Sequence, residues 1–254
     1  MRYIKRYAKA LYMSLAMFSA VPLPSYRRDE SCLSLMLPCL PLIGLLLGAA
    51  WWGTAKLLIL SGIHPTLAAG ALAVTPFLLS GFLHLDGFID TSDAVLSRRP
   101  LEDKLRILKD PHAGAFSVIA LAVLFVLQFA AVYAIIDGEK ELPAFLFITV
   151  ISRCCASLSL LSLKTMPQST YARSFKQNTR FTHRFFVFII AILTMVAAYM
   201  CTGLGGLAVG AFTVLGFAGA MTYAYIQFKG VSGDLAGYAM VIGELCGLIA
   251  LAVI

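Results

Sequence analysis

Three aspartates, Asp86, Asp90 and Asp93, follow one another at spacings of four and three in the stretch "HLDGFIDTSD". On a helix that turns about 100° per residue, these positions fall within an arc of about 60°. Three like charges on one stripe raise one another's pKa and destabilise the helix, and a bound cation removes that penalty. Because hard divalent cations prefer carboxylate oxygens, the spacing predicts a Mg²⁺ site. A solvated acidic helix face is the alternative.

The stretch "RRPLEDKLRILKDPHAGAF" follows directly. Pro100 suits the first turn of a helix and Pro111 ends it, so the pattern predicts a short surface helix over the acidic stripe. Asp110, at the end of this helix, is expected to bring a fourth carboxylate to the metal. Basic residues such as Lys109 are expected to bind phosphate oxygens, although they also serve to orient a membrane protein.

Two further acids lie far along the chain. Asp234 opens the last apolar stretch, where it would cap a helix or join the metal site. Glu244 is about 15 Å further along the same helix, where an ionisable residue needs a partner. Arg153, inside the apolar stretch "PAFLFITVISRCCASLSLL", is the candidate partner. The pair is either structural or functional, and the sequence leaves both open.

The elements that must position these residues are apolar helices. The chain has 254 residues, of which 60% are hydrophobic and only 13% are charged, with a mean hydropathy of +0.86. A soluble domain carries about 25% charged residues. The composition predicts an all-α, polytopic transmembrane bundle that forms one integral-membrane domain over residues 1–254. About seven stretches reach the roughly 20 residues that a span needs: 35–59, 66–84, 114–136, 143–163, 185–202, 206–228 and 234–254.

Lys and Arg predict the orientation of this bundle. The expected inner segments hold six, five, five and one of the 20 Lys and Arg: 1–33, 85–113, 164–184 and 229–233. This asymmetry is typical of cytoplasmic loops, so we expect a multi-pass protein of the cell inner membrane with the aspartates on the cytoplasmic face. The net charge of +7 then reflects topology, and nucleic acid is excluded as a partner.

The first residues predict a helix that lies in the membrane interface. Arg2, Lys5, Arg6 and Lys9 recur at helical spacing, with apolar residues on the opposite side. Such a helix binds anionic lipid through its basic face. We therefore expect residues 1–33 to be a cytoplasmic or interfacial segment of a protein whose main partner is the lipid bilayer.

The motifs together resemble those of a known family. "HLDGFIDTSDA" followed by "KDPHAGAF" is similar to the hallmark of the cobalamin synthase family, the adenosylcobinamide-GDP ribazoletransferases. "VPLP", "PLIGLLLG", "ISR", "YAR" and "GDLAGYAMVIGEL" fall in the family's order and approximate spacing. The resemblance covers nearly the whole chain.

The resemblance implies the last joining step of cobamide assembly, in which α-ribazole or its 5′-phosphate attacks adenosylcobinamide-GDP and GMP leaves. Mg²⁺ on the three aspartates would neutralise the pyrophosphate, and Asp93 or Asp110 would accept the proton of the ribazole 5′-hydroxyl. The implied substrate-binding residues are Lys109, Arg153, Arg173, Asp234 and Glu244. Association with a second copy or with other corrinoid-pathway enzymes is left open.

Two other functions compete with this one. A phosphotransferase of the CDP-alcohol type also uses aspartates at a membrane edge, but its D-x-x-D-G-x-x-A-R motif differs from the D-x-x-x-D-x-x-D order found here. An ion or solute transporter would instead line a pathway with Asp234, Glu244 and Arg153. A transporter is expected to place its important charges near mid-membrane and needs no acidic cluster at one surface.

Overall fold

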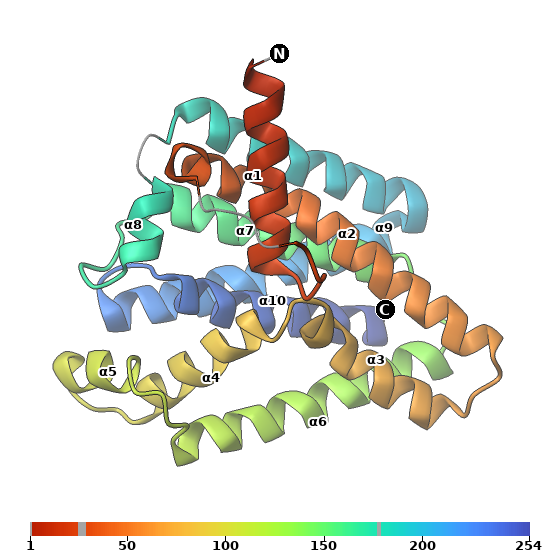
Figure 1. The fold of residues 1–254 in the computed structure, drawn as a ribbon. Helices are drawn as coiled ribbons and strands as arrows, with labels where there is room; N and C mark the ends of the chain where they lie inside the picture. The colour runs from red at the N-terminus through yellow and green to blue at the C-terminus, as the bar shows by residue number, and fades with distance from the viewer. Residues whose placement is uncertain (1, 25–28, 177–178) are drawn as a thin grey trace.

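The computed structural model describes residues 2–24, 29–176 and 179–254, and these fold into helices joined by short loops (Figure 1). No strand occurs among them, so the all-α prediction is confirmed. In chain order the helices are α1 (Arg2–Phe18), the 3₁₀ turn η1 (Glu30–Cys32), α2 (Leu33–Leu60), α3 (Pro65–Leu79), α4 (Leu83–Leu96), α5 (Leu101–Ile107), α6 (Ala115–Asp137), α7 (Ala144–Ser162), α8 (Thr170–Lys176), α9 (Phe181–Phe228) and α10 (Gly233–Val253).

Among the described residues, five helices are long and apolar enough to cross a membrane: α2, α6, α7, α9 and α10. A sixth span results if α3 and α4, which meet at 93°, are counted together. The predicted span 66–84 is therefore wrong at its end. The chain turns at Gly81 and Phe82, whose φ angles of 62° and 61° are left-handed, so that α3 stops at Leu79. The residues that follow belong to a separate helix.

Helix α9 is a folded-back pair rather than one rod. Its 48 residues would extend roughly 70 Å, whereas a hydrocarbon core is about 30 Å thick. Gly203 breaks the helix with φ 65° and ψ −147°. A Cβ placed on Gly210 would collide with the side chain of Met195, so the two halves lie side by side. This break falls between the expected spans 185–202 and 206–228.

Glycines allow the helices of the bundle to approach closely. A Cβ on Gly48 of α2 would lie 2.8 Å from the Cα of Leu146 on α7, and one on Gly44 would lie 3.0 Å from the carbonyl oxygen of Thr149. These distances leave no room for a side chain. The spacing of four between the two glycines thus brings α2 and α7 into direct backbone contact.

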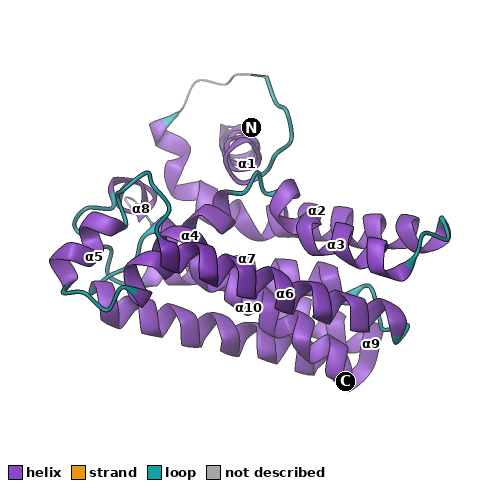
Figure 2. Ribbon diagram, turned by 90° about the horizontal axis from the view of Figure 1, so that it is seen from below, coloured by secondary structure: helices purple, strands orange, loops and turns teal. Residues whose placement is uncertain are grey.

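Helix α1 crosses the bundle instead of running along it. Figures 1 and 2, which differ by a quarter turn, show α1 lengthwise and then end-on, while the bundle helices extend across both views. Ala10, Met13 and Phe18 of α1 are buried where this helix packs against the rest of the protein. The amphipathic N-terminal helix is confirmed, and its contact with lipid stays a prediction. Arg27 and Arg28 of the basic N-terminal segment lie outside the described residues.

Candidate functional site

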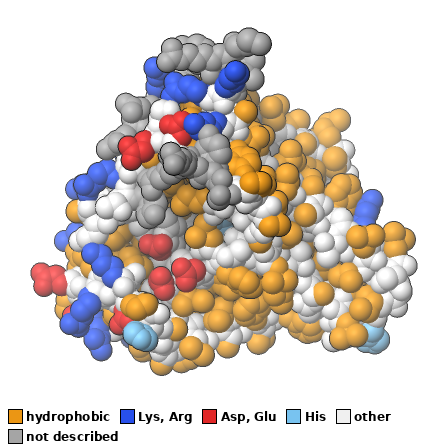
Figure 3. Space-filling model, viewed as in Figure 1, with side chains coloured by type: hydrophobic (Ala, Val, Ile, Leu, Met, Phe, Trp, Pro, Cys, Tyr) orange, Lys and Arg blue, Asp and Glu red, His pale blue; other side chains and the backbone are white. Residues whose placement is uncertain are grey.

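The predicted carboxylate stripe lies on α4. Asp86 is exposed, and Asp90 and Asp93 are half-buried, whereas His84 on the opposite side of the helix is buried. In Figure 3 a group of acidic side chains lies on the left of the visible face, and most of the visible Lys and Arg surround that end of the molecule. The prediction of one helix with its aspartates on one side is confirmed.

Asp234 joins these aspartates from α10. A Cβ on Gly87 of α4 would lie 2.7 Å from the carbonyl oxygen of Asp234, so the first turn of α10 packs directly against α4. Ser232, and not Asp234, caps α10, because its hydroxyl accepts the N–H of Leu235 at 3.2 Å. The Ser232 hydroxyl also donates to Asp234 Oδ2 at 3.3 Å. Of the two roles predicted for Asp234, capping is therefore filled by its neighbour.

The four carboxylates repel one another. Asp234 lies in the first turn of α10, and Asp93 contacts the first turn of α6. Asp86, Asp234 and Asp93 are all close enough to Asp90 for their negative charges to act on it. None of the ion pairs formed between described residues includes any of the four. The α4 face is thus a set of negative charges without a positive partner.

Asp93 is also anchored to the start of α6. Its Oδ1 accepts the backbone N–H of Ser117 at 3.3 Å. A Cβ on Gly114 would collide with the carboxylate, so the missing side chain makes space for Asp93. The positive end of the dipole of the 23-residue helix α6 favours a negative charge there. The second oxygen of Asp93 remains available to a ligand.

Three other candidates lie in loops or at helix ends. Asp110 is exposed and accepts the N–H of His112 at 3.0 Å, and these contacts hold the pKa of its carboxyl below the usual value. Lys109 beside it is exposed. Arg173 donates to the carbonyl oxygen of Pro167. Within the described chain no hydrogen bond or ion pair joins the three to the α4 carboxylates, and their roles remain predictions.

The donor set on α4 and α10 fits Mg²⁺ that arrives with a phosphate. Among the described residues no group of three or more His, Cys, Asp or Glu is close enough to hold a metal ion unaided. Mg²⁺, however, keeps several waters and is usually bound through one or two carboxylates plus the phosphates of a substrate. Hard carboxylate oxygens without a counter-charge match that requirement. The face therefore suits a metal held jointly by protein and substrate.

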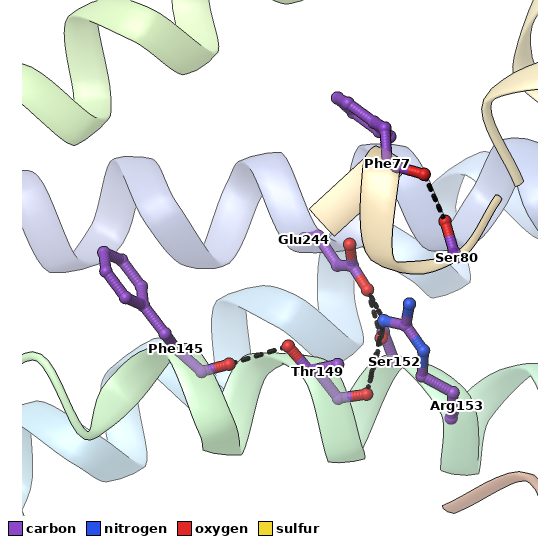
Figure 4. A network of polar contacts seen from close by, with 7 residues as sticks. All are labelled: Phe77, Ser80, Phe145, Thr149, Ser152, Arg153 and Glu244. Atoms are coloured by element: carbon purple, nitrogen blue, oxygen red, sulfur yellow. Dashed lines mark hydrogen bonds and ion pairs between the residues drawn. The ribbon is translucent and has the colours of Figure 1, made fainter. Parts of the chain in front are cut away.

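Arg153 and Glu244 pair inside the bundle (Figure 4), as the sequence predicted. The guanidinium Nη1 donates to Glu244 Oε1, and the Ser152 hydroxyl donates to the same oxygen at 2.7 Å. Arg153 is 2% exposed and Glu244 8% exposed. The charges satisfy each other between α7 and α10, so the geometry favours a structural pair, and a part in substrate binding stays a prediction.

A cavity of about 470 Å³ lies beside Asp234, between α1, α2, α4, α7, α8 and α10. The sequence did not indicate it. Phe18, His84 and Phe175 line it from three separate helices. The short helix α8, which carries Phe175, falls in a segment that was predicted as a loop. His84 stands inside the aspartate motif but points away from the carboxylate stripe.

Comparisons with known proteins show what the whole chain is similar to. The family model for cobalamin-5-phosphate synthase matches residues 10–252. A Clostridium botulinum protein named adenosylcobinamide-GDP ribazoletransferase is 35% identical over 245 residues, covering 96% of this chain and 97% of its own. Proteins of the same name from Clostridium perfringens and Desulfitobacterium hafniense are 34% and 26% identical, covering 99% and 95% of this chain and 100% and 95% of their own. No solved structure matches the chain.

Proposed function

Because the chain belongs to the cobalamin-5-phosphate synthase family, we propose that its α4 face joins α-ribazole or its 5′-phosphate to adenosylcobinamide-GDP and releases GMP. This transfer completes the assembly of the cobamide. The observation that carries the proposal is the set of four unpaired carboxylates, Asp86, Asp90, Asp93 and Asp234, at one end of the bundle. A pyrophosphate substrate that brings a divalent cation supplies the positive charge that these groups lack.

In the reaction, a ribazole hydroxyl oxygen forms a bond to the phosphorus on the cobinamide side of the pyrophosphate. The bond from that phosphorus to the bridging oxygen breaks, and GMP leaves with the electron pair. The family is named for a cobalamin 5-phosphate, a product that keeps a phosphate at the position of the 5′-hydroxyl expected from the sequence as nucleophile. This name supports an attack by a different hydroxyl of the ribose when the substrate is the 5′-phosphate.

The α4 face supplies the residues for this step. Asp86, Asp90 and Asp93 would hold Mg²⁺, which when bound neutralises the pyrophosphate and the charge on departing GMP. A carboxylate of the same face accepts the proton of the attacking hydroxyl. Asp93 suits this role, since Ser117 fixes one of its oxygens and leaves the other free. Asp110 is turned toward His112 and would have to move.

We place the site on the cytoplasmic face of the cell membrane. The basic segment that follows α4 and the basic segment 164–184 support this orientation through the positive-inside rule. Nucleotide substrates and Mg²⁺ are cytoplasmic, and the amphipathic corrinoid is compatible with the bilayer boundary. α1, which crosses the bundle at a steep angle, would lie in the interface at that face (Figure 2).

The test uses the full-length protein in lipid vesicles with adenosylcobinamide-GDP, α-ribazole 5′-phosphate and Mg²⁺, and follows GMP release. We expect activity that EDTA abolishes and that added Mg²⁺ restores. A parallel reaction with a CDP-linked lipid and an alcohol addresses the nearest rival. Release of CMP there, with no GMP from the corrinoid, would contradict the proposal. Solute uptake by the vesicles without any transfer would favour a transporter.

A further inference from the structure

The cavity beside Asp234 is lined mainly by apolar side chains. Met17 and Phe18 enter it from α1, and Leu40 and Leu83 from α2 and α4. Its volume of about 470 Å³ lies within the range of about 300–1,000 Å³ of small-molecule sites. An apolar space of this size, close to the polar reaction centre, suits a flat aromatic ring better than a lipid chain or a whole corrin.

His84 is the exceptional group in the lining. It is 7% exposed, and no hydrogen bond to either ring nitrogen occurs within the described residues, although Nε2 is fully buried. Its ring stacks on Phe18 with centroids 6.5 Å apart and planes 20° apart. Buried polar groups in proteins almost always have a hydrogen-bond partner. An imidazole left unpaired in the wall of a cavity therefore points to a partner that the ligand provides.

The cavity leads to the carboxylates. Asp234 lines it, and the backbone of Asp234 lies against Gly87 on α4, the helix that carries Asp90. Gln168, Ser169 and Thr170, which precede and begin α8, line the cavity and are partly or fully exposed. A ligand with an aromatic ring inside and a sugar at the mouth would place sugar hydroxyls next to the polar residues and Asp234.

We propose that this cavity binds the aromatic base of the ribazole nucleoside, with His84 as the residue that recognises its free ring nitrogen. The inference rests on the proposed function and names the place of one of its two substrates. A benzimidazole base is flat and apolar and carries one unsubstituted ring nitrogen that accepts a hydrogen bond. The protonated nitrogen of a neutral imidazole donates one. The ribose then extends toward Asp234 and the α4 face, where its hydroxyl reacts.

The guanine of the other substrate fits the same cavity poorly. Guanine carries several donors and acceptors along its edges, and each one buried without a partner costs free energy. Of the polar side chains among the described residues that line the cavity, His84 alone is buried. One donor facing one acceptor matches a benzimidazole and leaves most of a guanine unsatisfied.

The experiment combines substrate kinetics with binding. We expect His84→Phe, which keeps the stacked ring but has no nitrogen, to raise KM for α-ribazole 5′-phosphate about five- to tenfold, the effect of one lost hydrogen bond. KM for adenosylcobinamide-GDP should not change. Ala172→Leu narrows the cavity from α8 and should raise the same KM, while Ser174→Leu, on the same helix but outside the cavity, is the matched control.

Equilibrium dialysis tests the site without catalysis. Full-length protein in lipid is incubated with α-ribazole 5′-phosphate or with ribose 5-phosphate, which has the sugar and phosphate but no base. We expect the nucleotide to bind and ribose 5-phosphate to bind at least tenfold more weakly, and we expect Ala172→Leu to reduce the difference. The comparison of the two probes on the wild-type protein remains informative even if one of the variants fails to fold.

Several results would overturn the inference. Equal binding of the two probes would show that the base has no pocket. A rise in KM for adenosylcobinamide-GDP in Ala172→Leu or His84→Phe would assign the cavity to the other substrate, and equal effects of Ala172→Leu and Ser174→Leu would remove the role of the cavity. Failure of the proposed function looks different, because the wild-type protein then releases no GMP from the corrinoid at all.

Discussion

Two groups of charge in this apolar bundle have opposite surroundings. On α7 and α10, Arg153 and Glu244 are buried and satisfy each other, with Ser152 completing the contact. On α4 and the first turn of α10, four carboxylates lie together without an ion-pair partner among the described residues. The two charges of the first group pair with each other, although Arg153 Nε has no hydrogen-bond partner among the described residues, and the second group needs a ligand to supply positive charge. Charged side chains that have no ion-pair partner therefore indicate the functional site better than charged side chains in general.

Of the substitutions considered, Asp90→Asn is expected to change turnover the most. Removing a carboxylate from the α4 face should lower turnover by about a thousandfold or more, roughly 4 kcal/mol of transition-state stabilisation. The melting temperature should stay the same or rise, because the substitution relieves repulsion from Asp86, Asp93 and Asp234. GMP release and thermal unfolding in lipid measure the two quantities.

Asp137→Asn is the control for this substitution, since Asp137 ends α6 and is exposed. It should leave turnover unchanged. Near-normal turnover in Asp90→Asn would show that the α4 carboxylates are no more important for activity than the buried Arg153–Glu244 pair.

Breaking the buried pair should have the reverse signature. Arg153→Met leaves Glu244 unpaired in the bundle and should cost about 3–5 kcal/mol of unfolding free energy. Arg153→Met combined with Glu244→Gln removes both charges and should recover most of that loss. Unfolding in mixed lipid–detergent micelles measures the stability, and turnover is normalised to folded protein. A double variant that folds well but has lost all turnover would make the pair functional instead of structural.

A smaller effect is expected where α4 meets α10. Gly87→Ala adds a Cβ 2.7 Å from the carbonyl oxygen of Asp234, so the two helices must separate. We expect a loss of about 1–3 kcal/mol in stability and a fall in turnover, because Asp234 moves away from Asp90. Gly53→Ala on α2 is the matched control, as its Cβ would meet nothing within 4 Å. Equal behaviour of the two variants would show that this contact does not position the site.

The smallest effect concerns a half-buried ion pair at the edge of the molecule. Lys9 and Asp29 connect α1 to the segment before α2, and the Lys9 ammonium, with further help from Ser31, lowers the pKa of Asp29 to about 2. Stability from a carboxylate with a lowered pKa is present above its ordinary pKa and is lost as the pH falls through the lowered value. Asp29→Asn should therefore melt slightly below the wild type near neutral pH and equally with it near about pH 2. A difference that persists in acid would assign the effect to something other than this charge.

Local periodicity was enough to predict one part of the site. The spacing of Asp86, Asp90 and Asp93 fixes their common face once a helix forms, and the helix forms as expected. The partner of Glu244 was equally predictable, because few charges occur inside apolar stretches and each needs a counter-charge. The glycine-rich stretch around Gly203 marked the reversal of α9 for a similar local reason.

The remaining features depend on packing between distant segments. Gly87 gives no local sign that α10 will rest on it and bring Asp234 to Asp90. Phe82 adopts a left-handed conformation that a bulky residue rarely takes, so the end of α3 was misplaced. His84 was judged only by its direction on α4. The cavity that gives it a role is assembled from six helices, and no pattern within one helix could reveal it.

Binding of Mn²⁺ in place of Mg²⁺ measures whether the carboxylates of α4 hold a metal ion together with the substrate. Full-length protein in lipid is titrated with Mn²⁺ in the presence of adenosylcobinamide-GDP, and the free ion is followed by electron paramagnetic resonance. We expect the wild type and Asp137→Asn to bind the ion with equal affinity, and we expect Asp90→Asn to weaken binding by at least about tenfold. Equal affinity in Asp90→Asn would mean that the carboxylates of α4 do not hold the metal.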